Sequence, residues 1–579
     1  MFKLATYLRA YKKEVIIGPI FKLLEAIFEL LLPTIVALMI NRGIGMRDTS
    51  YVFKMGALML GLSIVGFGCS LICQYYASRA SQGFGTTLRN KLYKHISSLS
   101  YAEMDKYGTS SLINRITNDV NQLQLAVAML IRLVIRAPFI CVGAIIMSML
   151  LDFRLSLILL VATPVFGVIL YFIITRTAPI YRIYQQKLDR IALVLSENLS
   201  GVRVIRAFAK SRQERVRFNE SSEDLTRTAI RVGRISALLN PMTTLVVNAA
   251  IIAILWVGGI HINEGQLSQG EIVAFINYIT QILLALIVVS NLVIIFTKAY
   301  SSAARINEVL ATTTSIPDLG DIGLTSTNRI NAPAIQFNNV SFGYNKMGEF
   351  ALENVSLEIG QGETIGIIGS TGSGKSTFVN LIGRFYDAIQ GDVRINGVNV
   401  KDYSLQQLRS QIGIVPQKAL LFTGTIADNI RWGNEHATDE EIMKAAAIAQ
   451  AEEFILKLPE GYNTGVSRGG INLSGGQKQR LTIARAVVAQ PHILILDDSS
   501  SALDFATDAA LRRELKEHCV QTTVLMVSQR VSSVQQADKI IVFEEGRIAG
   551  IGTHAELMIG CEVYKEIYLS QLSSEESRK

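Results

Sequence analysis

Two adjacent acids, Asp497 and Asp498, follow the apolar run 493–496 near the C-terminal end of the chain. The run has the composition of a buried strand, and an acid at the end of such a strand can hold a magnesium ion that is bound to phosphate. A second acid beside the first can polarise an attacking water. If the upstream motifs bind phosphate, we expect Asp497 to be the metal ligand and Asp498 the residue that acts on water.

A glycine-rich segment upstream has the spacing of a phosphate-binding loop. Residues 369–377 match G-x-x-x-x-G-K-[ST], with a strand-like run before them and a helical stretch after them. Backbone N–H groups of such a loop converge on phosphate oxygens at a helix N-terminus. Lys375 is expected to reach the β- and γ-phosphates, and Ser376 to ligate magnesium. The predicted nucleotide-binding residues are Gly369, Ser370, Thr371, Gly372, Ser373, Gly374, Lys375, Ser376 and Thr377.

A third motif reads Leu473-Ser474-Gly475-Gly476-Gln477. Ser474 and the next two amides begin a predicted helix and offer a second anion site, which one domain cannot fold back onto its own phosphate. Together with the P-loop and the acidic strand end, in this order, the motif makes nearly the whole chain resemble an ATP-binding cassette (ABC) exporter half-transporter. In that family two cassettes pack head to tail, and each ATP lies between one P-loop and the opposing LSGGQ.

The resemblance assigns roles to further residues. Tyr344 is similar to the aromatic residue that stacks on adenine; the alternative is a tyrosine that merely ends a strand. Gln417, in Val-Pro-Gln, resembles the glutamine that contacts magnesium and links the cassette to the membrane helices. Asp504, in Ser-Ala-Leu-Asp, resembles the D-loop acid. Segments 108–119 and 197–208 look like the tips that dock on the cassettes, with solvated helical hairpins as the alternative.

Two residues depart from the family pattern. Asp498 stands where the family has glutamate, and Gln529 stands where it has histidine. A carboxylate shortened by one methylene leaves the water about 1.5 Å out of reach, and misplacement of that size costs on the order of 10²-fold in rate. A glutamine donates a hydrogen bond but cannot become cationic. The expected catalytic residues of this site are thus Lys375, Gln417, Asp498 and Gln529, in a degenerate form.

This combination predicts a heterodimer. The P-loop side of the chain should bind ATP and Mg²⁺, with Ser376, Gln417 and Asp497 as metal ligands, but should hydrolyse ATP slowly. Its intact LSGGQ should complete an efficient site whose glutamate and histidine come from a second ABC half-transporter. The competing interpretation is a homodimer with two slow sites.

The first half of the chain is apolar enough to cross a membrane. Six stretches reach the roughly 18–20 residues that a bilayer requires, and they lie near 15–40, 55–77, 127–151, 155–175, 242–261 and 271–297. Residues 249–257 show none of the polar interruptions of a buried globular helix. The predicted fold is a six-span α-helical transmembrane domain (1–310), a linker (311–333) and an α/β P-loop cassette (334–579).

Charge distribution sets the predicted topology. The net charge of +8 is concentrated in the segments 78–126 and 176–236, whereas the short connection 259–270 has neither Lys nor Arg. The positive-inside tendency then places both termini and the cassette in the cytoplasm, in a multi-pass protein of the cell membrane. This distribution accounts for the basic charge without nucleic acid, which the six spans exclude as a partner. The partners expected are the lipid bilayer and a substrate.

Ionisable and amide residues inside spans are candidates for a substrate cavity. Glu25 and Glu29 share a face of the first span with Lys22, and Asn277 and Gln281 share a face of the sixth. The acids either attract cationic amphiphiles or form a local Lys22–Glu25 pair or a contact with a neighbouring helix. The amides either line the cavity or hold helices together.

The resemblance implies export of amphiphilic small molecules, of the multidrug type, by alternating access. Lipid flipping is an alternative. An ATP-gated channel or regulator is a further alternative, and the intact LSGGQ favours retained hydrolysis over it.

Overall fold

The computed structural model describes residues 2–318, 332–344 and 348–576, and it contains two compact units. Met1–Ser97 and Gly108–Thr312 form a helical unit, whereas Ser98–Tyr107 and Thr313–Lys579 form an α/β unit. The last long helix of the first unit ends at Ala311, where the predicted linker begins. Most of that linker, residues 319–331, lies outside the described residues.

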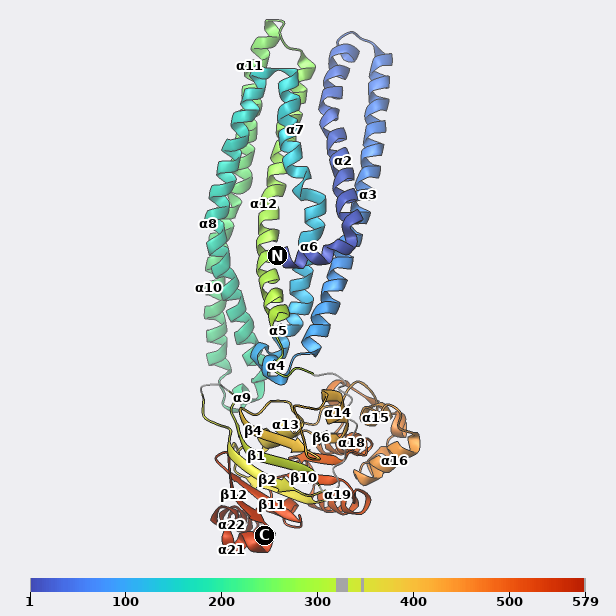
Figure 1. Cartoon of the computed structure of the whole chain (residues 1–579). Helices are drawn as coiled ribbons and strands as arrows, with labels where there is room; N and C mark the ends of the chain where they lie inside the picture. The colour runs from blue at the N-terminus through green and yellow to red at the C-terminus, as the bar shows by residue number, and fades with distance from the viewer. Residues whose placement is uncertain (1, 319–331, 345–347, 577–579) are drawn as a thin grey trace. The chain divides into compact units, whose positions relative to one another are not determined.

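Six helical segments of the described chain are long and apolar enough to cross a membrane. They span Lys3–Ile44, Thr49–Ser97, Thr109–Leu151, Phe153–Ser200, Ser211–Asn263 and Gln269–Ala311. The six predicted stretches fall inside these segments, one in each, which confirms the six-span prediction. The main helices are α2 (Lys12–Leu38), α3 (Thr49–Ser97), α6 (Val120–Met129), α7 (Arg136–Leu151), α8 (Phe153–Ser200), α10 (Ser211–Ala237), α11 (Leu239–Asn263) and α12 (Gln269–Ala311) (Figure 1).

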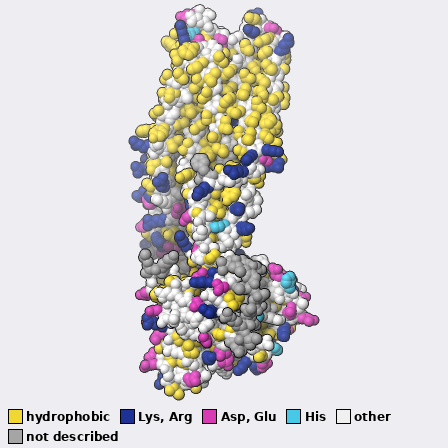
Figure 2. Space-filling view, viewed as in Figure 1, with side chains coloured by type: hydrophobic (Ala, Val, Ile, Leu, Met, Phe, Trp, Pro, Cys, Tyr) yellow, Lys and Arg dark blue, Asp and Glu magenta, His cyan; other side chains and the backbone are white. Residues whose placement is uncertain are grey.

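The surface of the helical unit matches a lipid environment. Figure 2 shows hydrophobic side chains that cover one face of the spans in a continuous band. Phe53, Leu150 and Trp256 leave 80%, 76% and 74% of their surface exposed. Such exposure of large apolar side chains over a whole band is typical of a membrane-spanning surface and not of a soluble one.

Polar side chains of α12 donate hydrogen bonds to backbone carbonyls of α2 near Pro33, which interrupts the hydrogen bonding of that helix. Pro33 has no N–H, so the carbonyl of Glu29 lacks its helical donor. The Nε2 atom of Gln281 donates to that oxygen at 3.3 Å. One turn away, the hydroxyl of Tyr278 donates to the carbonyl of Leu30 at 2.9 Å. In an apolar medium such carbonyls must be satisfied internally, so these side chains hold the two helices together.

The α/β unit contains two large sheets. An antiparallel sheet, which the sequence analysis did not anticipate, has the order β2-β1-β4-β5. The second sheet has the order β12-β11-β3-β10-β9-β6 and is parallel from β11 to β6, which confirms the predicted α/β pattern. The strands are β1 (Ile335–Phe342), β2 (Leu352–Ile359), β3 (Thr364–Gly369), β4 (Gln390–Ile395), β5 (Val398–Asn399), β6 (Ile412–Val415), β9 (Ile493–Asp497), β10 (Thr523–Val527), β11 (Lys539–Glu544) and β12 (Arg547–Gly552).

The first predicted tip of the long helices lies earlier in the chain than the prediction placed it. The described segment that packs within the α/β unit is Ser98–Tyr107, whereas 108–119 belongs to the helical unit. Gly108, at φ 73°, separates α4 (Tyr101–Tyr107) from α5 (Thr109–Asn114). The tip therefore precedes the glycine, because the left-handed backbone at Gly108 ends the docked helix.

Contacts of α4 explain why it stays with the α/β unit. The ring of Tyr101 packs edge-on against Phe385 with centroids 4.9 Å apart. The hydroxyl of Tyr386 donates to the Asp105 carboxylate at 2.9 Å. Burial, assisted by that bond, raises the pKa of Tyr386, so the phenol remains a donor throughout the physiological pH range.

A buried ionic network joins the third and sixth helical segments. Asp119, 2% exposed, accepts hydrogen bonds from Ser302 at 2.9 Å and from Arg305 Nε at 2.8 Å. Arg115, 8% exposed, donates to the backbone carbonyl of Arg305 at 2.7 Å and to Glu308 at 3.1 Å. The Asp119 carboxylate is almost fully removed from water, so hydrogen bonds and a cationic partner must offset its lost hydration.

We expect Asp119→Ala to destabilise the helical unit by about 2–3 kcal/mol, because it leaves Arg305 and Ser302 without this carboxylate in a partly buried site. The measurement is the shift in the unfolding midpoint of the purified protein in lipid nanodiscs. Glu223→Ala is the control, since the Glu223 carboxylate is 71% exposed and pairs with an exposed Arg227. Equal shifts for the two variants would contradict the role given to Asp119.

Candidate nucleotide-binding site

The glycine-rich loop connects β3 to α13 (Lys375–Ile382) and lies at the carboxyl edge of the parallel sheet. Gly372 and Gly374 have φ angles of 85° and 100°, which side chains rarely adopt. At Gly374 a Cβ would also lie 2.7 Å from the carbonyl oxygen of Ala351. The loop can therefore keep its shape only with glycine at these positions, and its amides precede the first turn of α13.

Lys375 is held against the loop that carries it. Its ammonium donates to the carbonyl oxygens of Gly369 at 2.8 Å and Ser370 at 2.6 Å. Burial lowers the pKa of Lys375, and the carboxylates of Asp497 and Asp498 oppose that shift. The Lys375 ammonium is suited to attract an anionic ligand, and the two carboxylates near it are suited to attract a cation bound to that ligand.

Oxygen donors gather beside the lysine. The hydroxyl of Ser376 lies 3.3 Å from Asp497 Oδ1 and donates to it. Burial raises the pKa of Asp497, and the adjacent Asp498 adds to the rise, while Ser376 and Lys375 oppose it. The Nε2 atom of Gln417 donates to Asp498 Oδ2 at 3.1 Å, so the Gln417 side chain also reaches this cluster. Hydroxyl, carboxylate and amide oxygens are the donors that Mg²⁺ prefers, and the donor set therefore fits that ion.

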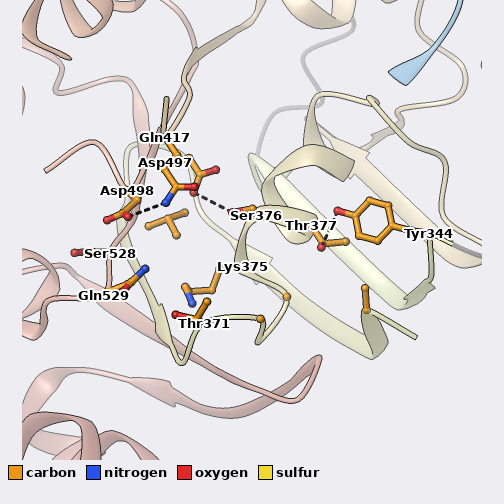
Figure 3. A pocket seen from close by; sticks show the side chains of 14 residues that line it. Tyr344, Thr371, Lys375, Ser376, Thr377, Gln417, Asp497, Asp498, Ser528 and Gln529 are labelled. Carbon is orange, nitrogen blue, oxygen red and sulfur yellow. Dashed lines mark hydrogen bonds between the residues drawn. The ribbon is translucent and has the colours of Figure 1, made fainter. Parts of the chain in front are cut away.

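The backbone at the ends of β9 and β10 fixes Asp498 relative to Gln529. Asp497 pairs with Val527 in the parallel ladder, and the Asp498 N–H donates to the Val527 carbonyl at 2.9 Å. Asp498 then adopts φ 45°, which turns the chain away from the sheet. Figure 3 shows Asp498, Ser528 and Gln529 together on one side of the pocket, opposite Tyr344.

Tyr344 lies on the other side of the pocket, after the end of β1. Its hydroxyl lies 3.0 Å from Thr377 Oγ1, and its ring packs edge-on against Tyr386 with centroids 5.3 Å apart. The Tyr344 side chain remains 55% exposed. An aromatic ring that is anchored at its edges and open on a face can stack on a planar heterocycle.

These residues line a single cavity of about 290 Å³. Its lining contains most of the residues predicted from sequence, together with Ala351, Val527 and Ser528, which were not predicted. The full lining is Tyr344, Ala351, Thr371, Gly372, Gly374, Lys375, Ser376, Thr377, Gln417, Asp497, Asp498, Val527, Ser528 and Gln529. The lining does not include Gly369, Ser370 or Ser373, which instead form the loop behind Lys375.

The LSGGQ motif starts a different helix and is not part of this lining within the described residues. Ser474 caps α18 (Gly475–Val487), and its hydroxyl accepts the N–H of Gln477 at 3.3 Å in a capping box. Leu473 is buried beneath the motif, whereas Ser474 and Gly475 are exposed. At Gly476 a Cβ would lie 3.1 Å from the carbonyl of Ala502, so the motif and the D-loop pack closely.

Asp504 has a local structural role in this chain. It caps α19 (Phe505–His518) by accepting the N–H of Thr507 at 2.9 Å. That bond lowers the pKa of Asp504, so the residue remains a carboxylate. The acid is outside the cavity lining, and its predicted role at a second site remains a prediction.

Arg485 was not found by sequence reasoning, although it connects two predicted parts. From α18 its guanidinium donates to the backbone oxygens of Asn429 and Leu420, at 2.8 and 3.0 Å. It also donates to Asn429 Oδ1 at 2.8 Å. The segment that follows Gln417 is thereby tied to the helix that LSGGQ begins. A lone arginine in a helix gives no sequence signal for such a contact.

The four candidate cavity residues lie in the helical unit, and each of them has a partner there. Lys22 pairs with Glu25 at 2.7 Å, as the local alternative anticipated. Glu29 pairs with Arg136 of α7 at 2.5 Å. The Gln281 amide donates to the Glu29 carbonyl, and the Asn277 amide donates to the Val273 carbonyl of its own helix at 2.8 Å.

Comparisons with known proteins agree with this architecture. Residues 15–286 match the family model "ABC transporter transmembrane region", and residues 352–501 match "ABC transporter". The chain is 39% identical to the uncharacterized ABC transporter ATP-binding protein YfiB of Bacillus subtilis, and the match covers 100% of both chains. It is 33% identical to the putative multidrug export ATP-binding/permease protein YgaD of the same organism, covering 98% of each.

Two further similarities concern a flippase and a solved fold. The chain is 32% identical to the ATP-dependent lipid A-core flippase of Hahella chejuensis, over 90% of this chain and 89% of that protein. The structure of a bacterial Atm1-family ABC exporter with ATP bound has a TM-score of 0.80, covers 97% of this chain and 99% of its own, and is 24% identical. Six membrane-spanning helices, a P-loop pocket and these matches together make the chain a half-transporter of the ABC exporter family, with one ATP-binding cassette.

Proposed function

We propose that this chain is one subunit of a heterodimeric exporter that moves amphiphilic small molecules out of the cytoplasm. The observation that carries the proposal is that the altered catalytic positions and the intact LSGGQ motif lie at different places on the chain. Asp498 and Gln529, which depart from the family pattern, line the chain's own pocket, whereas the unchanged LSGGQ lies outside it and is exposed at Ser474. The second site to which LSGGQ contributes then belongs to another chain.

At its own pocket the chain would bind ATP well. The loop amides and Lys375 receive the phosphates, and Tyr344 offers its open ring to adenine. Lys375 exchanges its bonds to Gly369 and Ser370 for bonds to phosphate, which its position at the loop makes possible without a large movement. Ser376, Asp497 and Gln417 would hold Mg²⁺, which neutralises phosphate charge when it is bound.

Hydrolysis at this pocket would be slow for geometric reasons. The Asp498 carboxylate is one methylene shorter than glutamate, and it already accepts a hydrogen bond from Gln417. Its backbone is held by β10 through the Val527 carbonyl, so the main chain does not compensate for the lost length. Gln529 offers a neutral amide where a histidine would offer a cation, which weakens stabilisation of charge on the γ-phosphate.

Coupling to transport would run through the cytoplasmic helix tips. In the proposed topology both termini and the cassette lie in the cytoplasm and the spans cross the cell membrane. Closure of two cassettes around ATP would move α4, which contacts Tyr386, and Tyr386 in turn contacts Tyr344. Segment 197–208 would supply the second tip. The cavity would then open outward, and hydrolysis at the efficient site, which this chain's LSGGQ completes, would reset it.

The substrate class is supported by relatives and by charge within the spans. The names of two relatives refer to multidrug export and to lipid A-core flipping, both of which concern amphiphilic molecules. Ion pairs inside membrane spans are costly and are functional candidates. Glu29 and Arg136 leave 35% and 23% of their side chains exposed, so a substrate with a charged head group can reach both.

Three other functions compete with this proposal. A lipid flippase would use the same chain with a lipid as its substrate, and a homodimeric exporter would turn over slowly at two equal sites. An ATP-gated channel would use binding without net pumping. Uptake into inside-out vesicles against a concentration gradient separates a pump from a channel, since a channel only equilibrates its substrate.

The division of labour predicts unequal effects of matched substitutions. Asp498→Asn should lower ATP turnover of the complete transporter by less than about 2-fold, because the slow site contributes little. Replacing the corresponding glutamate of a co-purified second half-transporter with glutamine should abolish turnover. Both are measured as phosphate release in nanodiscs. Strong ATPase activity of this chain alone, lost in Asp498→Asn, would support the homodimer instead.

Lys375→Ala should weaken MgATP binding at the chain's own site by about 10- to 100-fold, since a charge-assisted contact to phosphate is worth roughly 1.5–3 kcal/mol. Binding is measured with a fluorescent ATP analogue on the purified chain. Lys444→Ala, at an exposed lysine of α16 (Asp439–Ile448), is the control and should leave affinity unchanged. Unchanged affinity in Lys375→Ala would remove the P-loop from the proposed site.

The Glu29–Arg136 pair can be tested by neutralising each partner and then both. If the pair contacts substrate, Glu29→Gln reduces ATPase stimulation by cationic amphiphiles by about 5-fold or more, and the double variant Glu29→Gln/Arg136→Gln does not recover it. If the pair only joins α2 to α7, the single variants lose stability and the double variant regains it. Stimulated ATPase and the unfolding midpoint are measured on the same samples.

A further inference from the structure

The C-terminal helix of the cassette packs against the segment that follows β10. Helices α21 (His554–Gly560) and α22 (Glu562–Glu576) bury Tyr564, which is 0% exposed, against Val531 and Val534 of α20 (Val531–Val534). The hydroxyl of Tyr564 lies 2.8 Å from His554 Nδ1, so its burial leaves no unsatisfied donor. This packing brings the next turns of α22 beside Gln529.

Gln571 of α22 forms two hydrogen bonds with the backbone on either side of Arg530. Its Nε2 donates to the carbonyl of Gln529 at 2.7 Å, and its Oε1 accepts the N–H of Val531 at 2.9 Å. One side-chain amide thus pairs with a C=O and an N–H two residues apart, as a neighbouring strand would. We call this pair of bonds the Gln571 clasp.

Other contacts hold the same segment from the opposite side. The N–H of Ser528 donates to the Ile367 carbonyl of β3 at 3.0 Å, and the N–H of Arg530 donates to Ser528 Oγ at 3.0 Å. The guanidinium of Arg530 lies over the ring of Phe505, 5.2 Å from its centroid. The main chain at Gln529 is therefore fixed between the sheet and α22, and its carbonyl is bound by Gln571 while its side chain lines the pocket.

We propose that Gln571 is a positioning residue of the ATP site: the clasp sets the place of the Gln529 amide at the γ-phosphate. This rests on the proposed contact between Gln529 and that phosphate. Because Gln529 has no charge to draw it to the phosphate, its backbone position determines how well its amide reaches. A misplacement on the order of 1 Å at such a group is costly, and the clasp restricts that movement.

The nucleotide itself supplies a sharp test, because ADP has no γ-phosphate. In Gln571→Met, which keeps the length of the side chain and removes both hydrogen bonds, the Kd for MgATP should rise about 3- to 10-fold, the effect of one weakened phosphate contact. The Kd for MgADP should not change. The control is Lys565→Met, at an exposed position of the same helix. Both constants are measured by titration of the full-length chain in lipid nanodiscs.

A double-mutant cycle shows whether Gln571 acts through Gln529. Gln529→Ala should produce the same selective loss of MgATP affinity, and Gln529→Ala/Gln571→Met should produce no further loss. Amide hydrogen exchange at Val531 should accelerate in Gln571→Met and remain slow in Gln529→Ala. A purely structural clasp would instead weaken MgATP and MgADP equally, and that result would overturn the proposal.

The outcomes also separate this inference from the site on which it rests. If Gln529→Ala leaves the MgATP Kd unchanged, the proposed phosphate contact of Gln529 is wrong and the positioning role falls with it. If Gln529→Ala is selective and Gln571→Met has no effect, the clasp alone is wrong. Should Gln571→Met fail to fold, Gln571→Glu serves in its place: it can accept the Val531 N–H but has no N–H for the Gln529 carbonyl, and the same selective loss is expected.

Discussion

The end of the parallel ladder between β9 and β10 is the constraint on which the site depends. The last pair is Asp497 with Val527, and the next N–H, that of Asp498, still donates to the Val527 carbonyl. The segments that follow β9 and β10 leave the sheet here, and these last main-chain bonds determine the direction in which they leave. Asp497, Asp498 and the Gln529 segment therefore hold their mutual positions through main-chain bonds. Side-chain identity then decides what chemistry these fixed positions can perform.

The same constraint explains what the sequence could predict. The P-loop, the acid pair and Gln417 each follow a strand, and the carboxyl ends of neighbouring parallel strands meet at one edge of a sheet. Knowing the motifs and the α/β pattern was therefore enough to bring these residues into one pocket. The six spans were equally predictable, because bilayer thickness sets a length and a composition that few soluble helices share.

Other parts depend on contacts that sequence spacing does not reveal. Arg485 and Gln571 act on backbone groups distant along the chain, and neither belongs to a motif. The docked tip α4 was placed too late because Gly108 was taken as part of the tip, whereas its left-handed backbone ends the helix before it. Gln281 was compatible with a cavity or with helix packing. The structure places Gln281 beside the Glu29 carbonyl, which lacks a helical donor because of Pro33, and this identifies the role of the Gln281 amide.

The left-handed backbone at Asp498 has a consequence for how such a site changes over generations. Short polar side chains such as Asp and Asn adopt positive φ with less strain than longer ones, because they can bond to nearby backbone groups. At φ 45° an exchange of glutamate for aspartate is therefore well tolerated by the fold, even though it shortens the side chain to which the proposed function assigns the attacking water. Selection on folding alone would not remove that exchange, and the reverse step would gain nothing in stability. In a pair of chains that divide their tasks, the loss is then easy to acquire and is reversed only if activity at this pocket is again required.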